Sequence, residues 1–345
     1  MFWLEFLLFG DLGLYGRHDE FVAGVTEKVV KELWQHSNMT LIVAAGNPHF
    51  VAQLSDRRLT TIGGTSPLII TDESNKATVW EVPSGRFLIG YNGITSENVR
   101  WNTHFLINEL LLDLAPKYDF QPFAIIQALS DGLGKALSRN FRKEPKEHRR
   151  LTIMFTGLLE KGDGVSCSPV QVLVTNYQEW GVGDSEKAWD QFKATFCTPR
   201  SDFDWPTIVQ RVGAWMVVED SEREALRELL KLGIPPRAVL GKMVSLLPGW
   251  SARSGGTVGL HAHSLAITAD RSRQPIERYH SEGESKKYYW TSRVITTPQI
   301  SIAIGDPEIK VHDSLVLGAL PATPHPRYPI TPRRSRVSYH SLTNV

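Results

Sequence analysis

The chain has 345 residues, about 2.3 times the length of a 150-residue domain, so it can hold one large domain with appendages or two domains. Hydrophobic residues make up 41% and charged residues 22%, which is typical of globular proteins and excludes a collagen, a coiled coil and a wholly disordered chain. The formal net charge of +1 argues against nucleic acid as a partner. The two cysteines, Cys167 and Cys197, exclude a disulfide-rich scaffold and favour a cytoplasmic location.

The N-terminal segment has its own character. Residues 1–15 are apolar but short and include Glu5 and Asp11, so they fit neither a signal peptide nor a bilayer span, and no membrane partner is expected. Residues 17–36 have helical spacing of apolar residues, which predicts an amphipathic helix. Either this helix packs on the body of the protein, or translation starts at Met39 and residues 1–39 are an extension that is not translated or is removed.

Strands dominate the next part of the chain, and two pairs are expected at residues 40–46, 49–55, 77–82 and 86–91. The first helix of the body should begin near Thr95 or Ser96, since either residue is a good N-cap, and should end before Pro116. A second helix is predicted over residues 122–140 by its apolar stripe.

The C-terminal half repeats this order. The predicted elements are, along the chain, a charged loop at 142–150, strands at 151–157 and 169–176, an irregular insertion at 177–205, helices at 207–217, 221–232 and 236–247, and strands at 257–268 and 299–304. Residues 318–345 are rich in Pro and Arg and are predicted to be disordered, so the globular domain should span residues 40–317.

Along the chain, groups of consecutive strands alternate with groups of consecutive helices, whereas βαβ units would alternate single strands with single helices. Two sheets packed face to face, each with a helical layer outside, would bury both faces of each sheet. The order of elements therefore predicts an α+β fold that forms a four-layer αββα sandwich.

Four residues in this pattern carry a resemblance. Thr40 opens the first strand, Asp56 followed by Arg57 closes the second, Lys76 opens the third, and Gly93 ends the fourth before a helix. The segments MTLIVAAGNPHFVAQLSDRRLT, NKATVWEV and RFLIGYNGITS, with SARSGGTVG further on, resemble proteasome-type β-subunits and their bacterial relatives, which are N-terminal nucleophile hydrolases. The resemblance covers roughly residues 40–268 and is strongest over residues 40–96.

The resemblance implies a hydrolase that cleaves an amide bond, for which a peptide is one candidate substrate, and that needs neither a cofactor nor a metal. Thr40 would be the nucleophile and its own α-amine, which titrates near pH 8, the general base. Lys76 would tune that amine, Asp56 would neutralise Lys76, and the N–H of Gly93 would meet the oxyanion. Copies of the chain would also be expected to associate into a homo-oligomer.

Two departures leave a second interpretation open. The family's Asp after the SGG turn falls on Gly259, and its Ser near Gly213 falls on Val212. The alternative is therefore a catalytically silent proteasome-like fold that serves as an assembly or interaction module. Met39-Thr40 is nonetheless a pair that removal of a starting methionine would process, which would make Thr40 the first residue.

Each candidate also has a plain structural explanation. Thr40 could be an ordinary strand residue, Asp56 with Arg57 and Arg58 a surface ion-pair cluster, Lys76 an exposed lysine, and Gly93 a turn. His261 and His263 lie two apart on a predicted strand and could bind a metal, but no third ligand is placed, so ordinary packing is favoured.

Overall fold

The computed structural model describes residues 40–60, 69–71, 74, 76–94, 102–143, 145–162, 166–179, 183–185, 187–197, 206–280, 291–304 and 309–312. These residues all belong to one compact unit of the chain. The predicted N-terminal extension at residues 1–39 and the predicted disordered tail at residues 318–345 lie outside the described residues.

The smaller of the two main sheets has five antiparallel strands. Its order is β12 (Ile208–Gly213), β1 (Leu41–Asn47), β2 (Phe50–Asp56), β13 (Ala262–Thr268) and β14 (Ile276–His280). The predicted β1–β2 hairpin is confirmed, with Asn47 opposite Phe50 at its turn. All seven residues of each strand of the hairpin are buried, because this pair lies near the centre of the sheet.

Strand β12 corrects the sequence analysis. A helix was predicted over residues 207–217, but Ile208–Gly213 pairs along β1, with Ile42 opposite Val212 and Leu41 opposite Gly213. Its β-branched Ile and Val residues suit the half-buried pleat of an edge strand better than a helix. Only Trp215–Val217 keeps a helical turn, and that turn is 3₁₀.

The larger sheet has eight strands. Their order is β11 (Lys193–Cys197), β8 (Cys167–Thr175), β7 (Leu151–Glu160), β6 (Gly85–Gly93), β5 (Ala77–Val82), β15 (Ser292–Thr296), β16 (Ser301–Ile304) and β17 (Ile309–His312). Strands β5 to β8 and β16 were predicted, although β7 and β8 are longer than expected. The β5–β15 pair is parallel, and the other neighbours are antiparallel.

Several short strands were not predicted. They are β11, β14, β15, β17 and two small hairpins, β3 (Leu59–Thr60) with β4 (Ile69–Thr71) and β9 (Gln178–Glu179) with β10 (Gly183–Asp184). The expected irregular insertion at residues 177–205 thus contributes an edge strand, β11, whose side chains are mostly exposed. Exposed edge strands have little apolar alternation, so the sequence pattern does not mark them.

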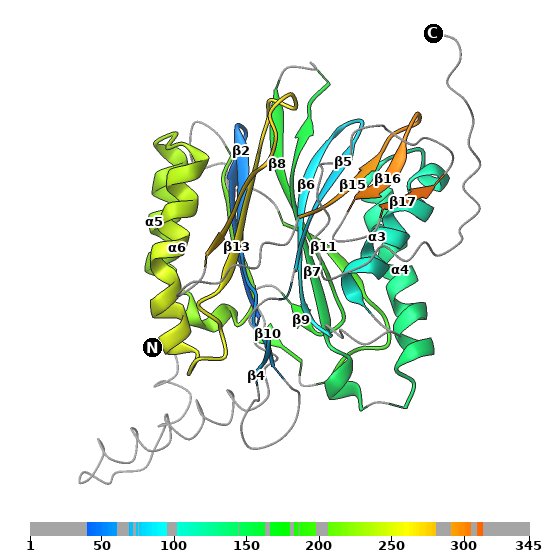
Figure 1. The fold of residues 1–345 in the computed structure, drawn as a ribbon, viewed down its shortest axis with the longest axis horizontal. Coiled ribbons are helices and arrows are strands. Elements are labelled where there is room, and N and C mark those ends of the chain that lie inside the picture. Colours follow the sequence, from blue (N-terminus) through cyan, green and yellow to red (C-terminus); the bar gives the residue numbers. More distant parts are fainter. Residues whose placement is uncertain are drawn as a thin grey trace, which may run out of the picture. The chain divides into compact units, whose positions relative to one another are not determined.

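Helices α5 (Asp220–Lys231) and α6 (Pro236–Arg253) lie on the smaller sheet, where α5 contacts β1 and β12 and α6 contacts β2 and β13 (Figure 1). Helix α5 is close to its predicted range. Helix α6 continues six residues past its predicted end, since it runs through Pro248. A capping box formed by Glu219 and Glu222 begins α5.

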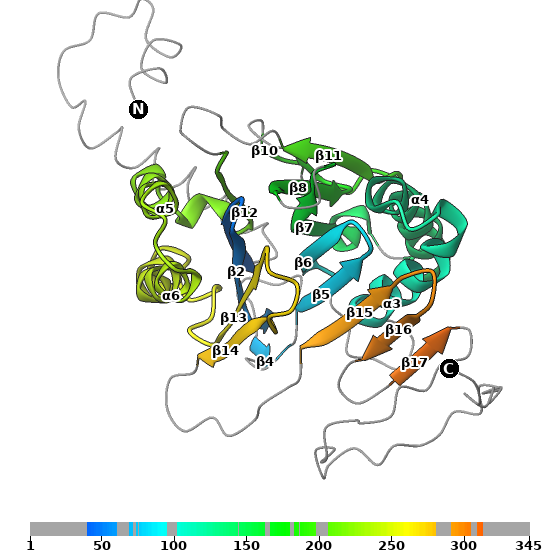
Figure 2. The ribbon, with the colours of Figure 1, turned by 90° about the horizontal axis from the view of Figure 1, so that it is seen from above.

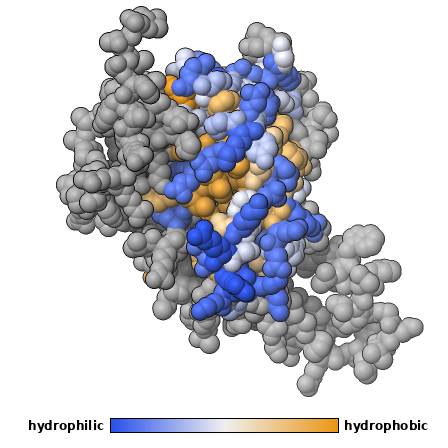
Figure 3. Space-filling model, turned by 90° about the vertical axis from the view of Figure 1, so that its right-hand side faces the viewer, coloured by the Kyte–Doolittle hydropathy of each residue, from blue (hydrophilic) through white to orange (hydrophobic). Residues whose placement is uncertain are grey.

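Helices α3 (Thr103–Leu114) and α4 (Pro122–Asn140) cover the outer face of the larger sheet, where α4 contacts β8 and β11 (Figure 2). The predicted range of α4 is confirmed. Helix α3 is capped by the Asn102 side chain, which accepts from the N–H of Phe105, whereas the proposed caps Thr95 and Ser96 lie outside the described residues. Viewed from this side, apolar surface shows between bands of hydrophilic side chains (Figure 3).

The two sheets face each other and contact through β2 and β6. A Cβ placed on Gly90 would lie 2.7 Å from Gln53 Nε2 and 3.0 Å from Ile42 Cδ1, so glycine lets the sheets approach closely here. The fold is therefore α+β with two packed sheets and helices on the outer face of each. Among the described residues, no helix is both long and apolar enough to cross a membrane.

Candidate active site

Thr40 lies directly before β1, at the end of both sheets where β2, β6 and β12 finish. Its carbonyl accepts from the N–H of Ala214 at 3.0 Å. Gly213 has φ +80°, and a Cβ there would lie 1.7 Å from the Thr40 carbonyl oxygen, so only glycine lets β12 pass this close to Thr40. The backbone of the candidate nucleophile is thus fixed by the strand beside it.

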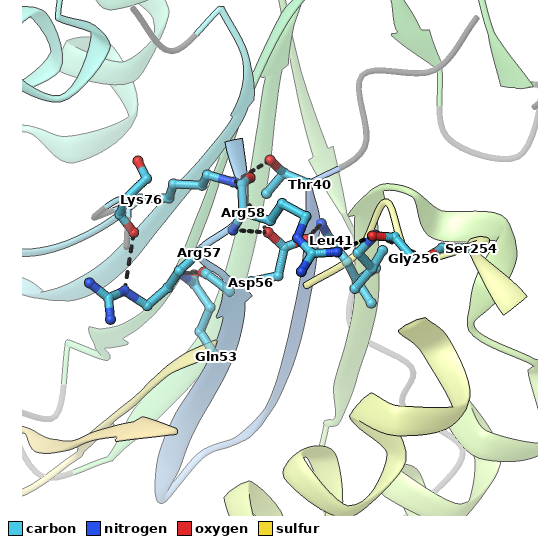
Figure 4. Close-up of polar contacts among 12 residues, drawn as sticks. Thr40, Leu41, Gln53, Asp56, Arg57, Arg58, Lys76, Ser254 and Gly256 are labelled. Carbon is cyan, nitrogen blue, oxygen red and sulfur yellow. Dashed lines mark hydrogen bonds and ion pairs between the residues drawn. The ribbon is translucent and has the colours of Figure 1, made fainter. Parts of the chain in front are cut away.

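Lys76 reaches Thr40 from the start of β5. Its Nζ donates to Thr40 Oγ1 at 2.5 Å, to Asp56 Oδ1 at 3.2 Å and to the carbonyl of Arg58 (Figure 4). The side chains of Lys76 and Asp56 are fully buried, and Thr40 is 6% exposed. The structure therefore brings together three of the four predicted site residues.

Asp56 is held by the backbone as well as by Lys76. Its Oδ2 accepts from the N–H of Leu41 at 2.7 Å, and its Oδ1 accepts from the N–H of Arg58 at 3.0 Å. Burial raises the pKa of the Asp56 carboxyl, while Lys76 and the two N–H groups act in the opposite direction. The carboxyl is thereby fixed next to the residue that follows Thr40 in the chain.

This arrangement directs a cation at the threonine oxygen. An ammonium group has three N–H donors and no acceptor, and its described acceptors are Thr40 Oγ1, Asp56 Oδ1 and the carbonyl of Arg58. A donor on Thr40 Oγ1 stabilises negative charge that develops there, and it leaves the hydroxyl proton to point toward another group. Lys76 is thus placed to stabilise an attacking oxygen, and the base that takes the proton must be a different group.

The neighbouring arginines anchor this corner of the fold. Arg58 donates from its guanidinium to the carbonyl of Gly256, which ties the Ser254–Gly256 turn to the site (Figure 4). Arg57 donates from Nε to the carbonyl of Ser74 at 3.3 Å and stacks over the Tyr279 ring at 4.9 Å. Arg57 is 1% exposed, and Asp56 and Lys76 are fully buried. The interpretation of Asp56 and its arginines as a surface ion-pair cluster is therefore wrong, and so is the interpretation of Lys76 as an exposed lysine.

Gly93, the fourth predicted residue, is placed differently. It has φ +105°, and a Cβ there would lie 2.0 Å from the carbonyl oxygen of Arg150. It pairs with Leu151 in the sheet, so its described contacts are with β7 rather than with Thr40. Close packing against Arg150 explains the glycine, and its role toward an oxyanion stays a prediction.

The two departures from the family pattern lie in apolar or loop positions. Val212 is buried in a cluster with Ile42 and Met154, so the place expected to hold a serine faces the space between the sheets as an aliphatic side chain. Gly259 is buried in the loop before β13, just after the turn that Ser254 closes by accepting from the N–H of Val258 at 2.9 Å. Neither residue supplies a polar side chain.

Sequence reasoning missed Asn92 and Tyr177. Asn92 is fully buried at the end of β6, and its Oδ1 accepts from Tyr177 Oη at 3.0 Å. Burial raises the pKa of Tyr177, whose hydroxyl therefore stays a donor. The available signal was the position of Asn92, which shares an inward face with Gly90 two residues earlier.

For His261 and His263, ordinary packing was favoured over a metal site. His263 is buried, and its Nε2 lies 3.0 Å from Glu277 Oε1 and 3.0 Å from Thr291 Oγ1, while its ring stacks on Tyr279. Burial lowers the pKa of His263, which favours the neutral ring. The described part of the chain contains no group of three His, Cys, Asp or Glu side chains placed to hold a metal ion.

Comparisons with known proteins add little. No family model matches the chain, and no curated protein matches it. Among solved structures, the chain is similar to Anbu (ancestral beta-subunit) from Yersinia bercovieri, with 12% identity over 70% of this chain and 87% of that chain and a TM-score of 0.43. Likeness at this level assigns the chain to no family.

Proposed function

We propose that the protein is a threonine-type N-terminal nucleophile hydrolase that cleaves an amide bond, with Thr40 as its nucleophile. One observation carries the proposal: a fully buried lysine donates to the hydroxyl of Thr40 while Asp56 and a backbone carbonyl hold the same ammonium. Burying a cation beside a carboxylate is costly for stability alone, because apolar residues of similar volume would often serve as well. A catalytic role, rather than stability, would explain why the Lys76–Asp56 pair lies beside the hydroxyl of Thr40.

The reaction requires Thr40 to be the first residue. Its free α-amine then lies within the same residue as Oγ1 and takes the hydroxyl proton as Oγ1 attacks the substrate carbonyl. Lys76 stabilises the charge that develops on Oγ1, and Asp56 keeps Lys76 charged and in place. The amine then gives its proton to the leaving nitrogen, and water hydrolyses the ester that remains.

Related features belong to the same proposal. The packing order of helices and sheets would make the fold the four-layer αββα sandwich of proteasome-like hydrolases. Residues 1–39 would be absent from the active form, whether through initiation at Met39 or through cleavage, and residues 318–345 would be a tail that the fold does not need. A cytoplasmic location, a peptide or other amide substrate and assembly of several copies complete the proposal.

The N-terminus of the native protein provides the first test. Intact mass should show a chain that begins at Thr40, because an acylated Thr40 has no α-amine to act as the base. An electrophile that acylates N-terminal threonine should then add once. The Thr40→Ala variant should take up none, whereas Thr296→Ala, which changes a buried threonine on β15, should still be labelled. Native protein that keeps residues 1–39 after incubation would rule the hydrolase out.

A silent proteasome-like module is the second candidate, and the side chains at two positions favour it. Val212 and Gly259 stand where the resemblance leads one to expect a serine and an aspartate that complete the network around the amine. A chain that begins at Thr40 but resists labelling would support this alternative. The protein would then act through assembly or interaction, with the Lys76–Asp56 pair as a remnant.

A further inference from the structure

Asn92 shares a layer with Thr40 in the space between the sheets. One layer further in, Gly90 of β6 faces Ile42 of β1, since a Cβ placed on Gly90 would lie 3.0 Å from Ile42 Cδ1. Side chains on a strand return to the same face every two residues. Moving two residues from Gly90 reaches Asn92, and moving two residues from Ile42 reaches Thr40, so the two side chains face the same space from opposite sheets.

The amide of Asn92 has a buried donor that no described residue pairs with. Its Oδ1 accepts from Tyr177 at 3.0 Å, which orients the amide, while Nδ2 has no hydrogen-bond partner in the part of the chain that the structure describes. The position of a Cβ on Gly213 lies 2.4 Å from this Nδ2 and 1.7 Å from the Thr40 carbonyl oxygen. The unused N–H thus lies beside the backbone of Thr40, where a buried donor without an acceptor calls for an explanation.

We propose that the Asn92 amide N–H binds the oxygen of the carbonyl group that Thr40 Oγ1 attacks. This inference rests on the proposed function and assigns a further catalytic residue to it. A donor that is unpaired in the free protein and paired when the oxyanion forms stabilises the transition state more than the ground state. Tyr177 would act as a positioning residue, because its hydroxyl fixes the direction of the amide.

The step balances within the site. The bond from Thr40 Oγ1 to the carbonyl carbon forms as the hydroxyl proton passes to the α-amine. The π electrons of the carbonyl move to its oxygen, which becomes the oxyanion that Asn92 binds. When the C=O bond re-forms, the C–N bond breaks, and the leaving nitrogen receives the proton from the α-ammonium group.

This assignment differs from the one made for Gly93. Gly93 packs its backbone against Arg150 and pairs with Leu151, and these contacts account for its conformation. Asn92, one residue earlier, faces the smaller sheet and carries the unpaired donor. The side-chain amide of Asn92, rather than the backbone N–H of Gly93, would therefore bind the oxyanion.

Two reagents separate this role from a structural one. A β-lactone is opened by attack on its carbonyl and forms an oxyanion, whereas a peptide vinyl sulfone adds Thr40 Oγ1 to a carbon–carbon double bond and places no charge on a carbonyl oxygen. Both additions are followed by intact mass on the purified protein. Asn92→Leu keeps the size of the side chain but removes the donor, and Asn92→Ala serves if the leucine variant does not fold.

The expected result is a split between the reagents. Asn92→Leu should slow β-lactone acylation roughly 10²–10³-fold while the vinyl sulfone rate changes less than about threefold. Tyr177→Phe should slow acylation about tenfold, as expected for one orienting hydrogen bond. The matched control is Asn108→Leu, another buried asparagine, whose Nδ2 donates to Ser292 on the outer face of the sheet, and it should change neither rate.

Other outcomes overturn the inference. Equal slowing of both reagents would show that Asn92 only shapes the site, and no slowing of either would show that its amide does not reach the oxyanion. If the wild-type protein reacts with neither reagent, the proposed hydrolase function fails first and this assignment fails with it. Wild-type reactivity therefore distinguishes the two failures.

Discussion

The face of the larger sheet that packs against α3 and α4 is mainly apolar, and its buried polar pairs Asn108–Ser292 and Thr78–His104 are hydrogen-bonded, whereas its face toward the smaller sheet mixes apolar and polar side chains over more of its area. Phe87, Ile89 and Tyr91 of β6 enter one extensive apolar cluster with the helices. From the same strand, Leu88 faces the smaller sheet in a smaller cluster, followed by Gly90 and Asn92. Alternation along one strand thus separates two environments.

The buried polar groups between the sheets lower the stability of the fold. Between the sheets, Gln53 Oε1, Gln171 Oε1 and Asn92 Nδ2 are buried without a partner among the described residues, and each such group costs about 1–3 kcal/mol relative to a satisfied one. The buried Lys76–Asp56 pair adds a desolvation cost. The comparison indicates that the helix-covered face supplies stability, and the proposed chemistry would lie in the space between the sheets. The following predictions test that division.

The largest effect is expected at Lys76. Lys76→Met leaves Asp56 buried without its cation, which should cost about 3–5 kcal/mol of unfolding free energy and should abolish labelling of Thr40. Urea denaturation and intact mass measure the two effects. The double variant Asp56→Asn/Lys76→Met removes the stranded charge and should regain much of the stability without regaining labelling. Recovery of both would mean that the pair has no part in the reaction.

The helix-covered face should behave in the opposite way. Ile89→Ala removes a buried aliphatic side chain from the large cluster and should cost about 2–5 kcal/mol, while Thr40 in the folded protein is labelled at the wild-type rate. Ile69 is 53% exposed and is the matched control, since Ile69→Ala should change stability by less than about 0.5 kcal/mol. A loss of labelling in folded Ile89→Ala protein would contradict the separation of the two faces.

His104 tests how the apolar side responds to acid. This histidine of α3 is buried beside Thr78, 3.3 Å from its hydroxyl, and burial lowers the pKa of the ring to about 4. Between pH 6.5 and 4 the unfolded chain binds a proton that the folded protein does not, so stability is complete above pH 6.5 and falls as the pH drops toward 4. The expected loss from this group is about 3 kcal/mol.

The measurement compares wild type with His104→Asn by urea denaturation at several pH values in this window. Carboxyl groups titrate in both proteins, so the difference between the two curves isolates the histidine. The variant should lose less stability than wild type on acidification. Parallel curves would show that His104 is protonated in the folded state and that this face is more polar than its contacts indicate.

The sequence predicted the hairpins and helices where burial gives a clear period. The β1–β2 and β5–β6 hairpins and α4 were predicted because their apolar residues alternate or recur at helical spacing. Strand β12 was mistaken for a helix because six residues followed by a helical turn hold too short a pattern to separate the two periods. Strand β15 gains its place through parallel pairing with β5, a distant partner that local pattern does not reveal.

The site shows the same limit. Thr40, Asp56 and Lys76 could be identified in sequence because their order and strand positions matched a family pattern, and the structure brings them together. Asn92 shares the inward face of Gly90, but the role proposed for it could not be identified, since that role depends on the space that Gly213 leaves on a strand of the other sheet. Contacts between sheets depend on how they stack, which no local sequence pattern states.

The smallest effect is expected at Gln53, which lies between the sheets but away from Thr40. Its Nε2 donates to Ser55 Oγ at 3.1 Å, and its Oε1 is buried with no partner among the residues that the structure describes. Gln53→Met has a similar shape and removes both the hydrogen bond and the unsatisfied acceptor, so the two changes in free energy oppose each other. Stability should therefore shift by less than about 1 kcal/mol in either direction, and labelling of Thr40 should not change. Thermal denaturation and intact mass check both.

A loss greater than about 2 kcal/mol would mean that Oε1 has a partner such as a bound water. Polar side chains deep between the sheets would then contribute to stability, and the cost of this face would be confined to the layer that contains Thr40, Lys76 and Asn92.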